Sequence, residues 1–435
     1  MPRCALRGQT FAFKADPFEA GPDAAVAHDS DGAVVVEDGR IVEVGPAAAM
    51  LARYPGIRVD AYPGQVIMAG FVDCHIHYPQ TRVIASYGAQ LIDWLNRYTF
   101  PAELAFADPA HAAAIAEIFL DEVLRNGTTT VCSYCTVHPE SVDAFFTTAT
   151  ARGMRVAGGK VLMDRNAPAG LLDTAQTGYD QSKDLIARWH GSGRCTYVVS
   201  PRFAPTSTPE QLAAAGALWR EHPGTLMQTH VSENLKEIAW VRDLYPDCPD
   251  YVGVYERYGL LGPGANLGHG IHLSEREKAV LRATGSGISH CPTSNTFIGS
   301  GLFDLAGFTE GAAPVPVGLA TDVGGGSSFS MLATMRAAYE IAQLRGHSLH
   351  PVKAYHLATL GSARVLRLED RIGNLAAGYE ADMIVLDPAA TPILAERTRS
   401  AGSLAEVLFA LMILGDNRAV TATYVAGRRV GGSGS

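Results

Sequence analysis

Cysteine is scarce in this chain, charged residues are few, and no long apolar run occurs. The seven cysteines among 435 residues are odd in number and sparse, so we expect reduced thiols in a cytoplasmic protein and no disulfide framework. No stretch approaches the roughly 18 uninterrupted apolar residues of a membrane span. The opening MPRCALRGQTFAFKADPFEAG also lacks the apolar centre of a signal peptide. We therefore expect neither a secreted nor a membrane protein.

Basic residues are too few and too scattered for a nucleic-acid-binding surface. The chain carries 35 Lys and Arg against 44 Asp and Glu, a net charge of −9, and no basic run beyond Arg428-Arg429. Contacts to phosphates need clustered Lys and Arg. We expect a small-molecule substrate and no nucleic-acid or membrane partner.

What the chain does have is a regular alternation of short apolar runs with helical segments. The runs cover residues 66–73, 128–133, 155–163, 195–200, 225–231, 265–270, 286–291 and 316–322. Between the first two, residues 107–127 repeat apolar positions at helical spacing, with Asp108-Pro109 at the start and Gly127 at the end. Eight runs alternating with helices over about 250 residues predict an α/β fold of the (β/α)8 TIM-barrel type. A doubly wound open sheet is the structural alternative, because periodicity alone does not separate the two.

Both ends of the chain have β character. AVVVEDGRIVEVG reads as a hairpin around Asp38-Gly39, and GNLAAGYEADMIVLD and ATYVAGRRV read as strands near the other end. We expect residues 1–65 and 369–430 to form one small β-sandwich domain beside a barrel of residues 66–368. The ending 431–435, GGSGS, reads as a flexible tail.

Histidine and aspartate recur at the ends of the predicted barrel strands. These residues lie at or just beyond the ends of the first, fifth, sixth and eighth runs: His75 and His77, His230, His269, and Asp322. Residues i and i+2 of a strand point to the same side, so both histidines of the first run can face the barrel mouth, where barrel enzymes place their chemistry. Each of these residues alone is more often structural. Together they suit zinc or ferrous iron.

Glu233 follows His230 by three residues and has two readings. Beside a metal it can shuttle a proton between water and substrate. As the residue before the helical stretch NLKEIAWVRDLY, it can also complement a helix dipole, and both readings can hold together. His272, His347 and His350 fall in helix or loop contexts and are expected to be structural or exposed.

A second candidate zinc motif has its cysteine and histidine residues in the wrong order and at the wrong spacing. Cys132 and Cys135 form a CxxC, and His138-Pro139-Glu140 is an H-x-E. Cytidine-type deaminases have H-x-E followed by a distant PCxxC, whereas here the cysteine pair comes first and no PCxxC follows. A packing role at a strand end is expected for the two cysteines.

The segments PGQVIMAGFVDCHIHYPQ, HVSEN, GHGIHL, SHCPTSN and TDVGGGSSFSML resemble those of the metal-dependent amidohydrolase superfamily. The resemblance runs from the N-terminal hairpin to about Val430. Three segments narrow it to the guanine deaminases of that superfamily: HIHYPQ, YTFPAE and SPRFAP. It implies hydrolytic deamination of guanine to xanthine and ammonia, in purine catabolism or salvage, by a zinc-activated water in a cytoplasmic homodimer.

The resemblance also implies roles for individual residues. One zinc, or alternatively Fe²⁺, would be held by His75, His77, His230 and Asp322. His269 would orient or additionally contact the metal-bound water, and Glu233 would be the proton shuttle. Gln80 and Arg202 would read the purine edge and Phe203 would pack on the ring. Ser200 stands where binuclear members carry a carboxylated lysine, which favours one metal.

Two alternatives stay open at this point. One is an amidohydrolase that deaminates another heterocycle, such as 8-oxoguanine, cytosine, an adenosine derivative or a triazine. The other is a non-catalytic scaffold of the same fold, which predicts that metal ligands are missing.

Overall fold

The computed structural model describes residues 3–87, 90–311 and 313–432. Its centre is a barrel of eight strands, each parallel to its neighbours. In barrel order they are β5 (Phe71–His77), β6 (Thr128–Tyr134), β7 (Arg155–Gly159), β9 (Cys195–Pro201), β10 (Leu226–Val231), β11 (Ala265–His269), β12 (Gly287–His290) and β13 (Val317–Leu319). The two-residue strand β8 (Val161–Leu162) pairs with β9.

The first and last strands are joined by the segment that follows β13. The backbone N–H of Asp322 donates to the carbonyl of His75 at 3.0 Å, and the N–H of His77 donates to the carbonyl of Val323 at 2.8 Å. These two bonds satisfy backbone groups that an open sheet edge would leave free. The barrel prediction is confirmed, and the open doubly wound sheet is not the fold.

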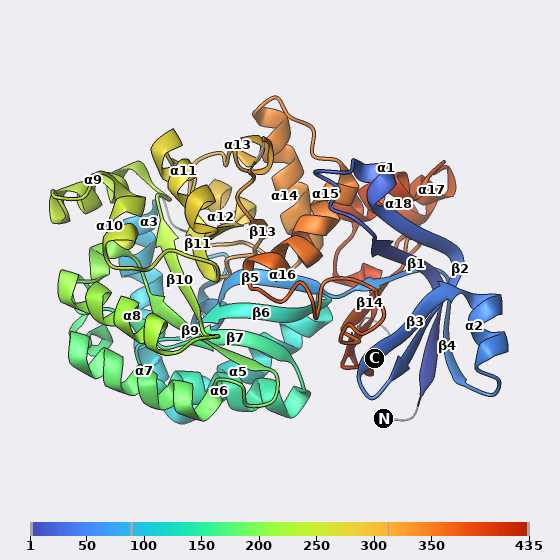
Figure 1. The fold of residues 1–435 in the computed structure, drawn as a ribbon, viewed down its shortest axis with the longest axis horizontal. Helices are drawn as coiled ribbons and strands as arrows, with labels where there is room; N and C mark the ends of the chain where they lie inside the picture. Colours follow the sequence, from blue (N-terminus) through green and yellow to red (C-terminus); the bar gives the residue numbers. More distant parts are fainter. Residues whose placement is uncertain (1–2, 88–89, 312, 433–435) are drawn as a thin grey trace.

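Helices cover the outside of the barrel (Figure 1). Those between successive strands are α5 (Pro109–Arg125), α6 (Pro139–Arg152), α7 (Ala175–Trp189), α8 (Pro209–Glu221), α9 (Leu235–Leu244), α10 (Tyr251–Arg257), α11 (Glu275–Thr284), α12 (Pro292–Phe297) and α13 (Leu305–Thr309). After β13 come α14 (Met331–Leu344), α15 (Pro351–His356), η6 (Leu357–Gly361) and α16 (Ser362–Val365).

Helix α5 forms where its sequence predicts it. The Asp108 side chain caps the N–H of Ala110, Pro109 is the first helical residue, and Gly127 follows the end with φ of 79°. Ile115 and Phe119, four residues apart, are fully buried on the face toward the strands.

The strands of both chain ends pair in one seven-stranded sheet beside the barrel. Its order is β16 (Arg428–Gly431), β15 (Val420–Val425), β14 (Met383–Leu386), β4 (Arg58–Ala69), β1 (Cys4–Phe13), β2 (Val26–Glu37) and β3 (Arg40–Pro46). Strand β14 lies antiparallel to β4, so the C-terminal part completes a sheet that the N-terminal part begins. Figure 1 shows these blue and red strands side by side at the right. A small β domain built from both termini is confirmed.

Short helices complete the chain. Between the strands of the terminal sheet come α1 (Pro22–Ala25), α2 (Ala47–Arg53), α17 (Pro392–Arg399), α18 (Leu404–Leu414) and η7 (Asn417–Ala419), and α18 packs against α14 and α15. After β5 come η1 (Tyr78–Val83), α3 (Leu91–Trp94), η2 (Leu95–Thr99), α4 (Phe100–Leu104) and η3 (Ala105–Ala107), and the loops hold η4 (Ala169–Leu171) and η5 (Ala204–Thr206).

The chain passes from one sheet to the other at Gly70. The apolar run 66–73, expected to be the first barrel strand, is divided: its first half ends β4 and its second half begins β5. A Cβ at Gly70 would collide with the side chain of Thr129, so only glycine fits this crossing. The division into domains at residues 65 and 368 stays a prediction.

A buried ion-pair network joins the barrel to the terminal sheet. Glu380, which precedes β14, accepts hydrogen bonds from Nε of Arg155 at 2.7 Å and from Nε of Arg194 at 3.0 Å. Burial by itself raises the pKa of Glu380, but the two guanidinium groups outweigh burial and lower the pKa to about 2. Glu380 is therefore ionised and bound to both cations at neutral pH.

Three further expectations concern the chain ends and the cysteines. Of the expected tail 431–435, Gly431 ends β16, and residues 433–435 lie outside the described part of the chain. None of the helices within the described ranges is long and apolar enough to cross a membrane. The seven cysteines are free thiols, and six of them are buried.

Candidate metal centre and substrate pocket

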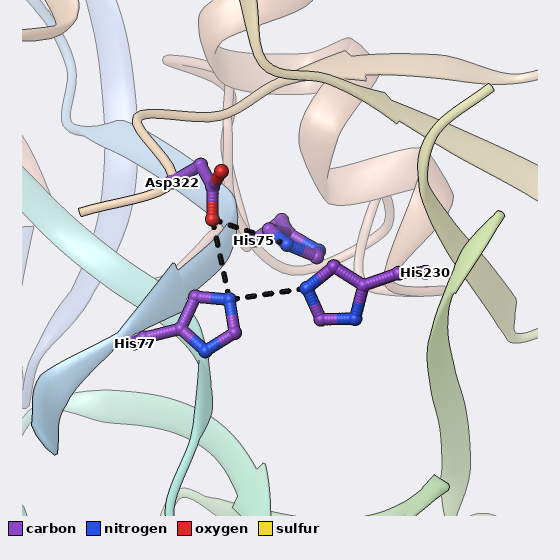
Figure 2. A group of neighbouring side chains, drawn as sticks. All are labelled: His75, His77, His230 and Asp322. Carbon is purple, nitrogen blue, oxygen red and sulfur yellow. Dashed lines mark hydrogen bonds and ion pairs between the residues drawn. The ribbon is translucent and has the colours of Figure 1, made fainter. Parts of the chain in front are cut away.

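Four side chains from three places in the barrel converge at the carboxyl ends of the strands. His75 and His77 alternate on β5, His230 comes from β10, and Asp322 follows β13. Oδ1 of Asp322 lies 3.4 Å from Nε2 of His75 and 3.2 Å from Nε2 of His77. One ligand atom from each of the four lies within 4.8 Å of the others, an arrangement that Figure 2 shows.

The ring nitrogens of these histidines fit a cation. Both nitrogens of His75 and Nδ1 of His77 are buried and make no hydrogen bond within the described structure. Burial lowers the pKa of all three imidazoles, that of His77 to about 3, so their nitrogens are neutral at pH 7 and carry lone pairs. Buried polar atoms without partners are costly, and a cation would satisfy them. The group of His75, His77, His230 and Asp322 therefore fits a divalent metal ion, and we call it the metal-fitting group.

The orientation of His230 is set by a backbone group. Its Nδ1 lies 2.7 Å from the carbonyl oxygen of Arg202, which can only accept, so the proton is on Nδ1. Nε2 keeps its lone pair and lies 3.2 Å from Nε2 of His77. This is the outer contact that commonly fixes the tautomer of a metal-binding histidine.

Asp322 is held in an unusual backbone conformation. Its φ is 51°, a left-handed value that is uncommon for residues other than glycine and often marks functional sites. The preceding Thr321 donates its N–H, at 3.2 Å, and its hydroxyl to the buried carboxylate of Asp73. Burial opposes ionisation of Asp322, but the imidazoles of His75 and His77 beside its carboxylate hold its pKa well below the usual range. The side chain is thus an anion facing the two imidazoles.

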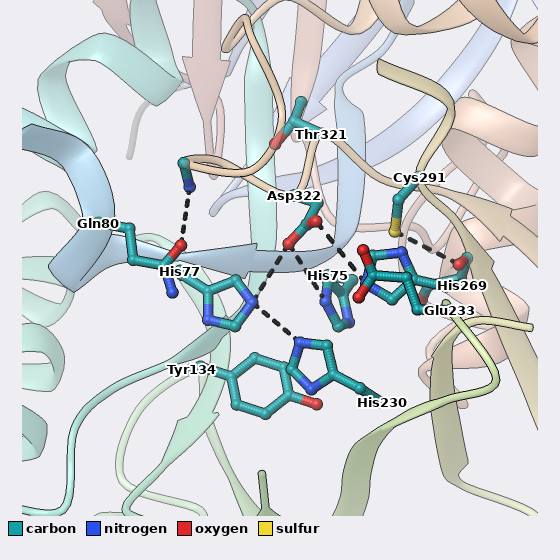
Figure 3. A network of polar contacts seen from close by, with 12 residues as sticks. His75, His77, Gln80, Tyr134, His230, Glu233, His269, Cys291, Thr321 and Asp322 are labelled. Atoms are coloured by element: carbon teal, nitrogen blue, oxygen red, sulfur yellow. Dashed lines mark hydrogen bonds and ion pairs between the residues drawn. The ribbon is translucent and has the colours of Figure 1, made fainter. Parts of the chain in front are cut away.

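His269, at the end of β11, faces the same carboxylate from the other side. Nδ1 donates to Oδ1 of Asn295 at 2.9 Å, which leaves Nε2 3.7 Å from Oδ2 of Asp322 and 3.4 Å from Oε2 of Glu233. With His75, Cys291 and Asp322 it forms a second group whose ligand atoms lie within 4.8 Å (Figure 3). Cys291 was not expected at this site.

Glu233 points into the site and does not cap a helix. The start of α9 is capped by Asn234 and Glu237, which form a capping box, so Glu233 is not the capping residue of this helix. Oε1 of Glu233 accepts from the hydroxyl of Ser300 at 3.0 Å. Burial, helped by the charge of Asp322, raises its pKa to about 8. The carboxyl group can therefore gain or lose a proton near neutral pH.

All of the expected site residues except His75 line one pocket. Its polar lining is His77, Gln80, Arg202, His230, Glu233, His269 and Asp322, and its apolar lining is Leu91, Trp94, Leu95, Phe203 and Ile298. His75 lies behind this wall and is fully buried. A concave pocket in which convergent polar groups face an apolar wall is typical of a small-ligand site.

Comparison with known proteins agrees with this geometry. Residues 66–430 match the model of the Amidohydrolase family. This chain belongs to the amidohydrolase family. A second, short match covers residues 32–56 and is described as an imidazolonepropionase-like composite domain of bacteria.

Individual amidohydrolases match along nearly the whole chain. Guanine deaminase of Escherichia coli (strain K12) is 48% identical over 401 residues, 92% of this chain and 91% of that protein. The solved structure of E. coli guanine deaminase has a TM-score of 0.95, 45% identity, and covers 99% of this chain and 100% of that one. A guanine deaminase from C. acetobutylicum, with guanine bound in the active site, has a TM-score of 0.89, 26% identity and the same coverage. The resemblance indicated by the sequence motifs is confirmed.

One carboxylate buried behind the lining of the pocket was not singled out from the sequence. Glu103, on α4, is buried and accepts hydrogen bonds from Nη1 of Arg202 at 2.8 and 2.9 Å and from Nε2 of Gln80 at 3.1 Å. Its only sequence signal is its place at the end of the motif YTFPAE. It connects two of the residues expected to read the substrate.

Tyr134 and the two cysteines of the CxxC are buried in and just after β6. Tyr134 stacks on the ring of His77, with centroids 4.5 Å apart and planes at 13°. Cys132, on β6, donates to Oε1 of Gln228 at 3.2 Å inside the barrel, and Cys135 is also buried. His272 donates from Nε2 to the carbonyl of Ser300 at 2.8 Å, a structural contact.

Proposed function

We propose that this amidohydrolase hydrolyses guanine: guanine and water give xanthine and ammonia. The observation that carries the proposal is the single pocket that combines the His/Asp group, the Glu233 carboxyl and the paired donors of Arg202 and Gln80. Relatives named guanine deaminase along nearly the full chain support the same reaction. The alternatives that deaminate other heterocycles lack comparable support.

We propose zinc, one ion per subunit, bound by His75, His77, His230 and Asp322. Three neutral imidazoles and one carboxylate suit zinc, and Fe²⁺ is the second choice for this donor set. When bound, the cation would supply the acidity that makes water a nucleophile near neutral pH. His269 would orient the water or contact the metal as well.

Glu233 would move the protons of the reaction. Attack of water at C2 breaks the conjugation of the ring, so N3 must gain a proton as the tetrahedral intermediate forms. A carboxyl group whose pKa lies at about 8 can take a proton from water and give it to N3. Asp322, ionised at neutral pH, would be the second acceptor. A proton returned to the amino group then lets it depart as ammonia.

Gln80, Arg202 and Phe203 would select the base. The guanidinium of Arg202 offers donors suited to O6 and N7 of guanine. Adenine presents a donor at position 6, so those buried donors would be left unpaired. Gln80 would read the neighbouring purine edge, and the buried ring of Phe203 would pack against the base.

A substrate panel tests the assignment against its nearest alternative. Ammonia release is measured with guanine, adenine, cytosine, 8-oxoguanine, adenosine and a triazine at equal concentrations. The proposal predicts that kcat/KM for guanine exceeds the others by orders of magnitude. A higher value for any other heterocycle would replace guanine as the substrate, and no activity on any would favour the scaffold reading.

We propose further that the enzyme is a cytoplasmic homodimer acting in purine catabolism or salvage, with domains bounded at residues 65, 368 and 430. Free, mostly buried thiols are compatible with a reducing compartment. Light scattering coupled to size exclusion measures the mass in solution, and a monomer mass at working concentration would contradict the dimer.

A further inference from the structure

The two polar side chains proposed to read the substrate share one buried carboxylate. Nη1 of Arg202 donates to both oxygens of Glu103, and Nε2 of Gln80 donates to one of them. Arg202 and Gln80 line the pocket, whereas Glu103 lies behind them and is 1% exposed. Glu103 therefore acts on a bound molecule through its neighbours.

The contacts of Glu103 decide which atoms face the pocket. Both carboxylate oxygens of Glu103 accept from Nη1 of Arg202. The Nε and Nη2 donors of the same guanidinium are therefore left for a ligand. Oε1 of Gln80 accepts from the backbone N–H of Gly324 at 3.2 Å, so this amide is held at both ends and its orientation is fixed. The Arg202 guanidinium also lies over the ring of Phe100, 5.6 Å from its centroid, which limits its movement.

Glu103 also sets the charge of the pocket. Arg202 is almost fully buried, so without a counter-ion its charge would act on the ligand with little screening. Paired with Glu103 it is electrically neutral as a unit, while its free N–H groups still donate hydrogen bonds. A neutral lactam edge loses little by this pairing, whereas an anion loses the attraction of an uncompensated cation.

We infer that Glu103 is a positioning residue that determines specificity: by neutralising Arg202 and orienting Gln80, it tunes the pocket to neutral lactam purines and against anionic ones. The inference rests on the proposed function. The inference also bears on product release. Xanthine carries one lactam N–H more than guanine, and it loses a proton more readily. A pocket with a free cation would hold ionised xanthine.

The test compares a neutral and an acidic purine. Hypoxanthine and xanthine share the O6 and N7 edge, and their Kd values are measured by calorimetry on the metal-loaded enzyme at mildly alkaline pH. Glu103→Gln keeps the shape and removes the charge, so it should shift the ratio of the two Kd values toward xanthine about tenfold or more, the size of effect of one nearby charge. Guanine turnover should then show stronger inhibition by xanthine.

The reciprocal variant separates charge from shape. Arg202→Gln leaves Glu103 as a lone anion and should move the same ratio in the opposite direction. Glu380→Gln, at a buried arginine–carboxylate pair far from the pocket, is the matched control and should leave the ratio unchanged.

Three results would overturn the inference. If Glu103→Gln and Arg202→Gln each raise the Kd values of both purines by the same factor, Glu103 only supports the fold. An unchanged ratio in a folded Glu103→Gln protein would mean that its charge does not reach the ligand. If the unaltered enzyme binds neither purine, the proposed function fails together with the inference, an outcome distinct from the other two.

Discussion

Nδ1 of His230 donates to the backbone carbonyl of Arg202 at 2.7 Å. The bond links neighbouring strands, since His230 belongs to β10 and Arg202 follows the last residue of β9. It sets the tautomer of an imidazole in the metal-fitting group, and it fixes the backbone of the arginine that faces the substrate pocket. The proposed metal ligand and the proposed base-reading arginine are therefore joined through neighbouring strands.

Loss of one imidazole should release the metal. His75→Ala is expected to lower the bound metal, measured by elemental analysis of dialysed protein, from about one ion per chain to well below that, because a four-ligand site loses one donor. His347→Ala is the matched control, since this histidine is exposed and outside the group. An unchanged metal content in His75→Ala would exclude it as a ligand.

Replacing the proton shuttle should stop turnover while the metal stays bound. Glu233→Gln keeps the size of the side chain and its contact with Ser300 but cannot exchange a proton. We expect kcat to fall by about 10²–10⁴, the usual contribution of general acid–base catalysis, with metal content unchanged. A variant with near-normal kcat would remove Glu233 from this role.

Loss of the guanidinium should weaken guanine without disturbing the metal. Arg202→Ala removes donors and leaves the Glu103 carboxylate buried without its cation, so we expect a loss in kcat/KM for guanine worth about 2–5 kcal/mol. The carbonyl that orients His230 is a backbone atom and remains. Steady-state kinetics beside metal analysis checks both expectations, and intact guanine hydrolysis would refute the recognition scheme.

The ion-pair network between the barrel and the terminal sheet should make the free energy of unfolding depend on pH. The pKa of Glu380 is lowered from its usual 4.5 to about 2, so the stabilisation is fully present above pH 4.5 and is lost as pH falls through 2. Glu380→Gln should therefore cost on the order of 3 kcal/mol at neutral pH, and less as the pH falls from 4.5 toward 2. Chemical denaturation across that range measures the difference.

An exposed ion pair provides the control for this stability measurement. Arg3 and Glu37 are bonded at 2.7 Å, but both side chains are about 40% exposed. Glu37→Gln should leave the free energy of unfolding nearly unchanged, because solvent screens an exposed pair. Equal effects of the two substitutions would contradict a special role for Glu380.

The barrel and the positions of the polar residues could be predicted because they follow local rules. Period-two alternation places His75 and His77 on one side of a strand, and parallel barrel strands bring their carboxyl ends to one rim. His230, His269 and Asp322 end later apolar runs and so reach the same rim. No long-range information was needed for these placements.

Other features depend on contacts that no local pattern encodes. The run 66–73 is apolar as far as Val72, with no break in its pattern at Gly70. Its division there is decided by pairing with β14, more than 300 residues away in sequence. Glu103 is 99 residues from Arg202, and in a short helix it looks like a surface carboxylate. Its burial follows from the guanidinium and amide that surround it, which only the folded chain brings together.

The most direct test of the whole account follows guanine by ultraviolet absorbance as it becomes xanthine, with the enzyme as purified, after treatment with a chelator, and after zinc is restored. The account predicts rapid conversion, loss of activity as metal is removed, and recovery with zinc. Conversion that continues at the original rate in metal-free protein, or no conversion by the zinc-loaded enzyme, would contradict it.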